Sequence, residues 1–374
     1  MTFIALFIGV VYLIIISKLT VGFDKVPDFH LQDNSPKTQF SMVIPFRNEA
    51  QNLPKLLKSI DNLNYPESLF EIIFVNDDST DDSVSIIETY FSGEQVNFKV
   101  IPNHRSSNSP KKDAISTAIG LAKKEWIVTT DADCIVPKYW LDCFDSFIQT
   151  NNTNFIVGPV SYHHVTSFLD RFQLLDILSL QGATIGGFGI GKPFLCNGAN
   201  LAYKKDLFHT LNGFEGNNGI ASGDDIFMLE KATKTGLDHV HYLKNSGAMV
   251  TTTAERNFKL LLEQRIRWAA KTSKYSGYFS KITALSVFSM NAILVCLFLF
   301  WIMDIASLRT LVYLFTLKFC IDFLLIFKVS RFFEQEQYLG TYVPSSFLYP
   351  FFSVYVAVNS IFKGYKWKGR SYKK

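Results

Sequence analysis

The stretch "FEIIFVNDDST", residues 70 to 80, joins an apolar run of strand length to two consecutive aspartates, Asp77 and Asp78. Apolar β-branched and aromatic residues favour a strand in its first part. Aspartate is also common in turns and at helix N-caps, so by itself the stretch suits a cap for the next helix equally well. Two later stretches, "TTDADC" (129–134) and "SGDDIF" (222–227), repeat the arrangement and favour a functional explanation.

The surrounding sequence alternates between strand-like and helix-like segments. Apolar runs of strand length are "FSMVIPF", "FEIIFVN", "EWIVTTD" and "NFIVGPV", and helical spacing occurs in "QNLPKLLKSIDNL", "DDSVSIIETYF" and "AISTAIGLAKK". This alternation predicts an α/β fold with right-handed crossovers and a mainly parallel sheet flanked by helices. Ligands of such sheets bind outside the carboxyl ends of the strands. We therefore expect Asp77, Asp78, Asp131 and Asp133 to line one crevice.

Apolar segments at the two ends of the chain predict membrane helices. Residues 2–16 form an uncharged run near the lower length limit of a span, and Lys18 and Lys25 follow it, which favours an uncleaved anchor over a signal peptide. Three further segments cover residues 283–303, about 307–328 and 345–362. A buried hairpin of a soluble domain is the weaker alternative for them.

Charged residues constrain these segments. Lys318 and Asp322 are spaced to pair on one helix face inside the second of the three segments. The tail "KGYKWKGRSYKK" is basic and contains no acid, which favours the cytoplasmic side of a membrane. Three full crossings after a cytoplasmic domain would place it outside. The last segment, with Pro344 and Pro350, is therefore the candidate for a re-entrant or interfacial helix, unless the tail is an exception to the rule.

Composition narrows the function. The net charge of +4 does not favour nucleic-acid binding. Five cysteines without paired metal spacing indicate a reducing compartment and no structural zinc. We divide the chain into an anchor (1–20), a catalytic domain (38–275), membrane segments (283–362) and a basic tail (363–374).

The stretch "TTDADC" gives the clearest indication of a chemical function. Two carboxylates one residue apart after a strand point in alternate directions, so one can bind a hard divalent cation while the other meets a neighbouring polar group. Such a cation can in turn hold a diphosphate. "SGDD" supplies a candidate general base, and two adjacent carboxylates can raise the pKa of one of them.

These motifs, in this order over residues 38–275, resemble glycosyltransferase family 2 with the GT-A fold, in its membrane-anchored bacterial form. "VIPFRNEA" is similar to the family's first strand and turn, "VNDDSTD" to its nucleotide-contacting turn, "TDAD" to its metal-binding DxD, and "SGDD" to its acidic pair. "QRIRW" is similar to its QxxRW motif, and "CNGANLAYKKDLF" to its acceptor-side segment. Asn76 and Asp78 replace a commoner Asp and Gly, which leaves open whether Asp77 or Asp78 meets the base.

The resemblance implies residue roles and a cofactor. Asp133 would bind Mg²⁺ or Mn²⁺, Asp131 would lie against the nucleotide sugar, and Asp225 would be the catalytic base of an inverting direct displacement. Asp224 would orient the acceptor or tune its neighbour. In the helical "EQRIRWAAK", Gln264, Arg267 and Trp268 share a face, where the arginine suits a diphosphate and the tryptophan a sugar ring. An interfacial helix with an aromatic anchor is the alternative.

Two loop features carry less information. Lys111 or Lys112, after "NHRSSNSP", is a candidate donor contact, although a solvated basic loop is as consistent with the sequence. His163 and His164 lack a matching ligand triad and favour neither catalysis nor metal binding.

We predict a multi-pass enzyme of the bacterial inner membrane with a cytoplasmic catalytic domain. It would transfer a sugar from a nucleotide sugar, which we predict to be a UDP-sugar, to a lipid or lipid-linked acceptor. The tail "WKGRSY" resembles the ends of ceramide glucosyltransferase-like members. A processive polysaccharide synthase, which also suits "QRIRW", and a catalytically silent scaffold are the alternatives.

Overall fold

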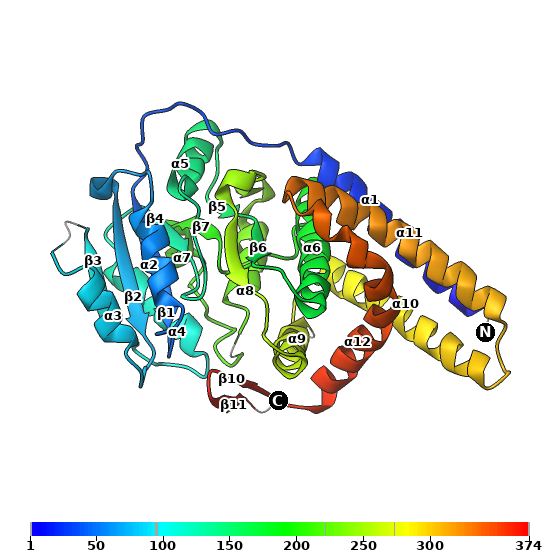
Figure 1. Cartoon of the computed structure of the whole chain (residues 1–374). Helices are drawn as coiled ribbons and strands as arrows, with labels where there is room; N and C mark the ends of the chain where they lie inside the picture. The colour runs from blue at the N-terminus through cyan, green and yellow to red at the C-terminus, as the bar shows by residue number, and fades with distance from the viewer. Residues whose placement is uncertain (1, 94–95, 221, 273, 373–374) are drawn as a thin grey trace. The chain divides into compact units, whose positions relative to one another are not determined.

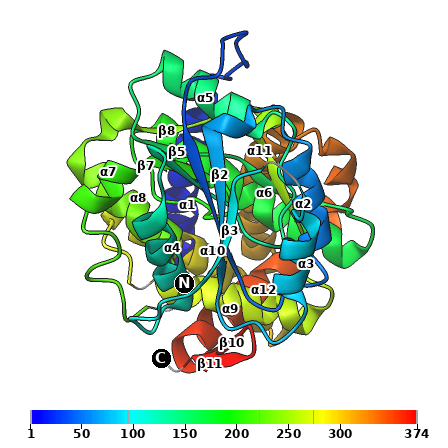
Figure 2. The same cartoon turned by 90° about the vertical axis from the view of Figure 1, so that its left-hand side faces the viewer.

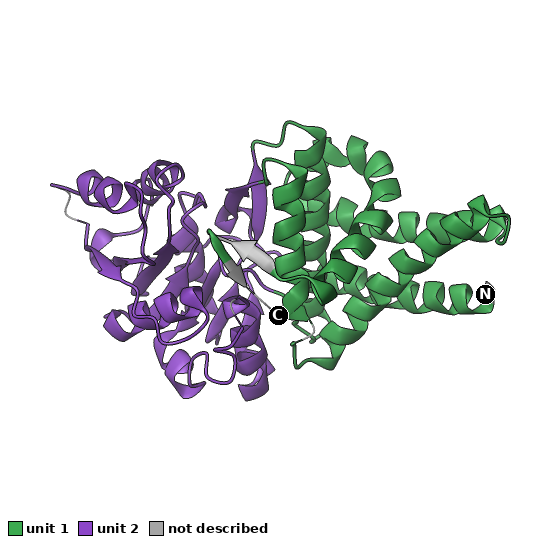
Figure 3. Ribbon diagram, turned by 90° about the horizontal axis from the view of Figure 1, so that it is seen from below, with its two compact units in different colours: residues 1–26, 164–195, 254–374 green, residues 27–163, 196–253 purple. Residues whose placement is uncertain are grey.

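The computed structural model describes residues 2–93, 96–220, 222–272 and 274–372, and these divide into two compact units. Unit 1 contains residues 1–26, 164–195 and 254–374, and unit 2 contains residues 27–163 and 196–253. Figure 3 colours them green and purple. The division does not follow chain order, since one internal segment, residues 164–195, groups with the two terminal segments.

Unit 2 is built on a seven-stranded sheet in the order β3-β2-β1-β4-β7-β5-β8. Most neighbours run parallel, and β7 is antiparallel to both β4 and β5. Its strands are β1 (Phe40–Phe46), β2 (Phe70–Asn76), β3 (Phe98–Pro102), β4 (Trp126–Thr129), β5 (Phe155–Val157), β7 (Leu201–Lys204) and β8 (Val240–Tyr242). The predicted mainly parallel α/β sheet is confirmed.

Helices flank this sheet, as Figures 1 and 2 show. They are α2 (Leu53–Asp61), α3 (Ser83–Tyr90), α4 (Pro110–Leu121), α5 (Trp140–Thr150), α7 (Lys205–Thr210) and α8 (Asp224–Thr235), with short 3₁₀ turns η1 (Glu67–Leu69), η2 (Leu237–His239) and η3 (Ser246–Ala248). A second, two-stranded sheet pairs β6 (Val160–His163) with β9 (Val250–Thr253).

The core of unit 2 follows from its strand sequences. Met42, Ile44, Ile72 and Phe74 have no exposed surface and belong to one apolar cluster with Trp126. Strands buried on both faces read as continuous apolar runs, which is why "FSMVIPF" and "FEIIFVN" could be recognised from sequence.

Unit 1 is helical. It contains α1 (Thr2–Lys25), α6 (Phe168–Gly189), α9 (Phe258–Thr272), α10 (Tyr278–Ile302), α11 (Leu308–Phe332), the 3₁₀ helix η4 (Glu336–Thr341), α12 (Tyr342–Phe362) and the hairpin β10 (Tyr365–Trp367)–β11 (Arg370–Tyr372). Among the described residues, four segments have the length and composition of membrane spans: Phe3–Lys25, Tyr278–Ile302, Leu308–Phe332 and Glu336–Phe362. The first extends well beyond the apolar run at residues 2–16.

Two helix-end contacts orient the apolar helices of unit 1. Asp24, near the end of α1, pairs with Lys328, near the end of α11, at 2.6 Å, so the two helices end at the same side of the unit. After α12 the chain returns to α9, because β10 contacts α9. Helix α10 begins next to α9, and α11 returns from the far end of α10, so α12 begins on the side of the unit where α9 lies. The contact of β10 with α9 places the end of α12 on that side as well. Pro350 lies inside α12, where it cannot donate a backbone hydrogen bond. Lys373 and Lys374 of the tail lie outside the described residues.

Buried charges join several helices of unit 1. Lys318 pairs with Asp322, as their spacing predicted, and the Tyr12 hydroxyl donates to Asp322 Oδ1 at 2.6 Å. In a second group, Asp176 on α6 accepts from Arg265 Nε at 2.6 Å and from the Tyr349 hydroxyl at 3.1 Å. Each carboxylate therefore has the charged and neutral donors that burial requires.

Helices α1 and α6 approach at backbone contact. A Cβ added to Gly186 would lie 2.2 Å from the Leu19 carbonyl oxygen, and one added to Gly189 would lie 1.8 Å from that of Gly22. Only glycine fits at such a crossing, which is a common way for membrane-associated helices to pack.

We predict that Gly186→Ala lowers the free energy of unfolding by about 1–3 kcal/mol, because the added methyl group forces α1 and α6 apart. Thermal unfolding of the detergent-solubilised protein measures the effect. Gly120→Ala is the matched control, since an added Cβ there meets nothing within 4 Å and the same change stabilises the helix slightly. Equal unfolding temperatures for Gly186→Ala and the parent would contradict the close contact.

Candidate active site

The predicted acidic residues follow strands that end at the same edge of the sheet. In the register of unit 2, Phe46 pairs with Asn76 and Val43 with Thr129, so the chain leaves β2 and β4 on the same side as it leaves β1. Asp77 and Asp78 follow β2, and Asp131 follows β4 after one residue. The expected placement at carboxyl ends of strands therefore holds.

Lys111 is the centre of one group of acids. Its ammonium lies 2.6 Å from Asp131 Oδ1 and 3.5 Å from Asp224 Oδ2, and only 17% of its side chain is exposed. Asp131 comes from the end of β4, Lys111 from the first turn of α4, and Asp224 from the start of α8. The "DAD" and "GDD" motifs are thus joined through one lysine.

Charge pairing outweighs burial at Lys111. Burial alone would lower the pKa of this ammonium, but the carboxylates of Asp131 and Asp224, together with the hydrogen bond to Asp131 and the charge of Asp225, raise its pKa above the usual lysine value. The ammonium therefore stays protonated at neutral and moderately alkaline pH, where it holds the two motifs together.

Asp225 lies beside the same group. Its Oδ2 accepts the Gly198 backbone N–H at 3.2 Å, and its Oδ1 accepts the N–H of Ile226. An added Cβ at Gly198 would lie 2.9 Å from Asp224 Oδ2, so this glycine lets the backbone approach the acidic pair. The N-cap of α8 is Gly223, with φ of 88°, and neither aspartate is the cap. Both aspartates therefore lie in the first turn of α8.

Asp77 and Asp78 belong to a second group, centred on Arg105. Arg105 Nε lies 2.7 Å from Asp77 Oδ1, and its Nη2 lies 2.7 Å from Asp78 Oδ2. Asp77 is buried and also accepts from the Asn103 amide at 2.8 Å, whereas the Asp78 side chain is 78% exposed and its backbone has φ of 55°. Neither residue caps α3, whose N-cap is Asp82, so the capping interpretation of "DDST" is wrong.

Asp133 lies partly exposed next to Asp131. The Thr252 hydroxyl donates to its backbone carbonyl at 3.3 Å, and the Cys134 thiol lies 3.7 Å from its Oδ1. Within the described part of the chain, no three His, Cys, Asp or Glu side chains are grouped as a metal cage. The hard carboxylate oxygens of Asp133 suit Mg²⁺ or Mn²⁺, which commonly use one or two protein carboxylates together with phosphate oxygens.

Among the described residues, several contacts of these acids were not foreseen from sequence. Arg105 and Asn103 follow β3 in "NHRSSNSP", and Arg47 donates to the backbone carbonyl of Asp77. Each of these three residues follows a strand of the same sheet, and this position is the feature by which the sequence could have indicated them. The histidines of β6 and its end play no part here: His163 is partly buried on β6, and His164 adopts a φ of 53°.

The two candidate lysines have different environments. Lys111 contacts the acids, whereas the Lys112 side chain is fully buried and donates to the backbone carbonyls of Asn217 and Ile220 at 2.8 and 3.0 Å. Of the two, the structure places Lys111 with the predicted site residues.

In unit 1, the predicted "QRIRW" helix is α9. Gln264 donates to Glu255 Oε1 at 2.8 Å, and the Arg265 guanidinium lies 4.2 Å from the Trp268 ring centre. Arg267 lies on the same helix, directly before Trp268. The sequence therefore located this helix correctly but gave no weight to Arg265, whose partner Asp176 lies 89 residues away.

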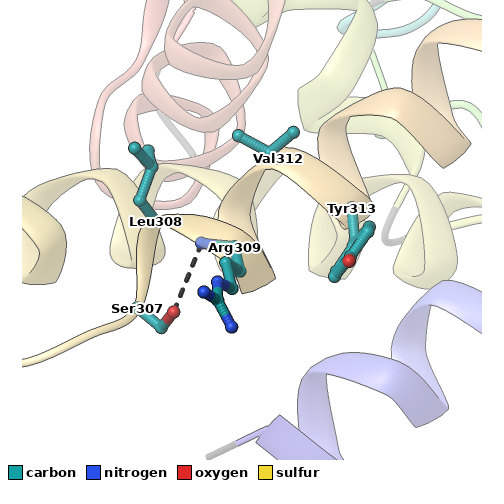
Figure 4. Close-up of a pocket in the computed structure, with 5 residues that line it drawn as sticks. All are labelled: Ser307, Leu308, Arg309, Val312 and Tyr313. Atoms are coloured by element: carbon teal, nitrogen blue, oxygen red, sulfur yellow. Dashed lines mark hydrogen bonds between the residues drawn. The ribbon is translucent and has the colours of Figure 1, made fainter.

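A shallow hollow in unit 1 has no acidic lining. Figure 4 shows Ser307, Leu308, Arg309, Val312 and Tyr313 around it, at the start of α11. The Ser307 hydroxyl accepts the Arg309 backbone N–H at 3.3 Å and caps the helix. This hollow lacks the groups that glycosyl transfer requires.

Comparison with known proteins identifies the part of the chain that carries the first two acidic motifs. Residues 41–211 match the model of the family described as glycosyl transferase family 2. These residues form a family 2 glycosyltransferase domain. The mannosyltransferase PcManGT from Pyrobaculum calidifontis, solved in complex with GDP-Man and Mn²⁺, superposes with a TM-score of 0.55 at 14% identity, over 91% of this chain and 99% of that one. The predicted GT-A type fold and glycosyltransferase family are confirmed.

Two curated relatives agree with this assignment. The chain is 24% identical to glycosyltransferase AglE of Haloferax volcanii over 52% of this chain and 62% of AglE. It is 25% identical to the probable glycosyltransferase YdaM of Bacillus subtilis over 61% of this chain and 54% of YdaM. The matches therefore span less than two thirds of the length of either relative.

We predict that Lys111→Met destabilises the glycosyltransferase domain by about 1–3 kcal/mol, because it leaves neighbouring carboxylates without their charged donor. A raised pKa means that the stabilisation is complete below the lysine pKa of the unfolded chain, about 10.4, and is lost only as pH rises through the higher folded value. The loss in free energy of unfolding caused by Lys111→Met should thus be the same at about pH 7 and about pH 9.

Thermal unfolding at both pH values measures this, with a change of the exposed Lys123 between α4 and β4, Lys123→Met, as control. A deficit that disappears by about pH 9 would show that the folded pKa of Lys111 is not raised.

Proposed function

We propose that the protein is a membrane glycosyltransferase that transfers a sugar from a nucleotide diphosphate sugar, with a UDP-sugar as the first candidate, to a lipid or lipid-linked acceptor. The observation that carries the proposal is the Lys111 group. A single ammonium lies against Asp131 of the "DAD" motif and Asp224 of the "GDD" motif, so the residues expected to bind the donor and those expected to activate the acceptor lie side by side.

On the donor side, Asp131 and Asp133 would bind the nucleotide sugar together with a divalent cation. A bound Mg²⁺ or Mn²⁺ would neutralise the charge that develops on the leaving diphosphate. Asp77 or Asp78 would contact the nucleotide base, and Arg105 pairs with both carboxylates in that turn. Gln264, Arg267 and Trp268 of α9 would contribute contacts to the diphosphate and sugar.

On the acceptor side, Asp225 would accept the proton of the attacking hydroxyl in an inverting direct displacement. The backbone N–H groups of Gly198 and Ile226 each donate to one of its oxygens, which fixes the orientation of the carboxylate. Asp224, which pairs with Lys111, would orient the acceptor. The roles of the two adjacent aspartates thereby differ.

The apolar helices of unit 1 support a membrane location and a lipid acceptor. We infer that α1, α10 and α11 cross the membrane and that α12 re-enters without crossing, because both of its ends lie on one side. The basic tail then lies on the side where the chain leaves α1 for the catalytic domain, as expected for the cytoplasmic face of a bacterial inner membrane. A processive synthase remains the second candidate, and the length of the product distinguishes the two.

We predict that Asp225→Asn lowers the rate of sugar transfer by about 10²–10⁴, the usual contribution of a general base. Asparagine keeps the acceptor oxygen for Gly198, so folding and nucleotide binding should be unchanged. Single-turnover transfer to extracted lipids, followed by mass spectrometry of the products, measures the effect.

The exposed Asp238→Asn in the same domain is the matched control. Transfer by Asp225→Asn at the parental rate would place the base elsewhere, with Asp224 the next candidate. Parental rates in both Asp225→Asn and Asp224→Asn would reject a catalytic role for "SGDD", whereas no transfer by the parental protein would favour the silent scaffold.

Activity should require a divalent cation. Excess chelator is expected to abolish transfer, and Mg²⁺ or Mn²⁺ to restore it, because the described residues offer few metal ligands and the donor diphosphate must complete the coordination. Asp133→Asn should weaken binding of UDP in the presence of Mn²⁺ by at least tenfold by calorimetry, an order of magnitude typical for loss of a charged contact. Asp206→Asn on α7 serves as control. Full turnover in chelator would exclude the metal.

A further inference from the structure

The first turn of α4 contains two consecutive lysines that contact the region around α8 differently. Lys111 lies 3.5 Å from Asp224, the first residue of α8. The Lys112 ammonium lies 4.7 Å from the ring centre of Phe227, three residues further along the same helical turn. Two adjacent side chains of one helix thus hold the start of α8, where the candidate base Asp225 is located.

Lys112 also attaches the segment before α8. Its ammonium donates to the carbonyls of Asn217 and Ile220 at 2.8 and 3.0 Å, while its side chain is only 1% exposed. Burial of an ammonium is costly unless oxygen acceptors or ring faces replace its water. The position of these two carbonyls is therefore strongly constrained by Lys112.

The attached segment, residues 211–220, contains no strand and no α-helix among the described residues. Glu215, Gly216 and Gly219 are exposed, and the segment consists of short turns joined by local backbone hydrogen bonds. Gly213 and Gly216 adopt positive φ angles of 48° and 83°. Phe214 packs on Phe208, and two lysine ammonium groups donate hydrogen bonds to four of the segment's backbone carbonyls.

Lys231, in the second half of α8, offers a contrast. It donates to the carbonyls of Leu211 and Gly213 at 3.1 and 2.7 Å, at the beginning of the same segment. Burial lowers its pKa, opposed by the charge of Glu215. The two lysines share one kind of contact but hold opposite ends of the segment.

We propose that Lys112 is a positioning residue for the acceptor side of the reaction: it fixes Leu211–Ile220 and the first turn of α8, and so sets the place of Asp225. This rests on the proposed function for the role of Asp225, whereas the effect on the segment does not depend on it. Lys111 links α8 to the donor side, and Lys112 links it to the segment that precedes it.

Lys112→Met keeps the length of the side chain and removes its donors. We expect the value of kcat to fall about 10- to 100-fold, as is typical of a misplaced reacting group, and the KM for the acceptor to rise. The dissociation constant for UDP in the presence of Mn²⁺ should change less than twofold. Lys231→Met, the matched control, should change kcat less than threefold.

Hydrogen–deuterium exchange on the same full-length variants in detergent gives a readout independent of activity. Lys112→Met should speed exchange in peptides covering residues 214–227, and Lys231→Met only in those covering 208–214. If Lys112→Met does not fold, Lys112→Gln replaces it, since glutamine retains one donor for a carbonyl. Parental exchange and parental kcat in the folded variant would overturn the proposal, as would an equal loss of UDP binding.

These outcomes separate the two hypotheses. Faster exchange at 214–227 together with no transfer by the parental protein from any tested donor would leave the positioning of the segment intact and reject the proposed function. Transfer by the parent with unchanged exchange and rate in Lys112→Met would reject the positioning role alone.

Discussion

The buried ammonium of Lys111 is the interaction on which the site depends. It lies between two carboxylates that come from different strands and helices, and without it those negative charges would repel one another in a partly dry environment. Its position in turn depends on α4 beginning at Pro110, directly after a loop that leaves the edge strand β3. The edge of the parallel sheet, one helix start and one lysine together bring the two acidic motifs within a few ångströms.

In unit 1, close helix packing and paired buried charges hold the elements together. Where α1 and α6 cross, glycines let the backbones touch, so that dispersion contacts replace the hydrophobic effect that is lacking in a lipid environment. Asp176 and Asp322 are each held by a basic side chain and a tyrosine hydroxyl. Charges inside such a bundle are costly, so each must be paired, and the pairs fix which helix faces meet.

Much of the fold could be predicted because its signals are local. The bounds of β1 and β2 coincide with the apolar runs, and the aspartates at strand ends follow from parallel topology alone. The i,i+4 spacing of Lys318 and Asp322 predicted their pairing. By contrast, α6 has no clear amphipathic pattern, and its grouping with the terminal helices follows from glycines that are informative only once α1 is seen beside them.

The sequence by itself determined the family, the strand-end acids and the apolar helices, because these features depend only on residue periodicity and on the order of the motifs. Only the tertiary structure decided which lysine meets the acids, that Asp77 and Asp78 both pair with Arg105, and that Gly223 and Asp82 occupy the N-cap positions of the helices that follow the acidic motifs. The physical reason is that side chains adjacent in sequence point in different directions, so partners such as Lys111 and Asp224, 113 positions apart by number, are selected by packing and charge compensation rather than by local pattern.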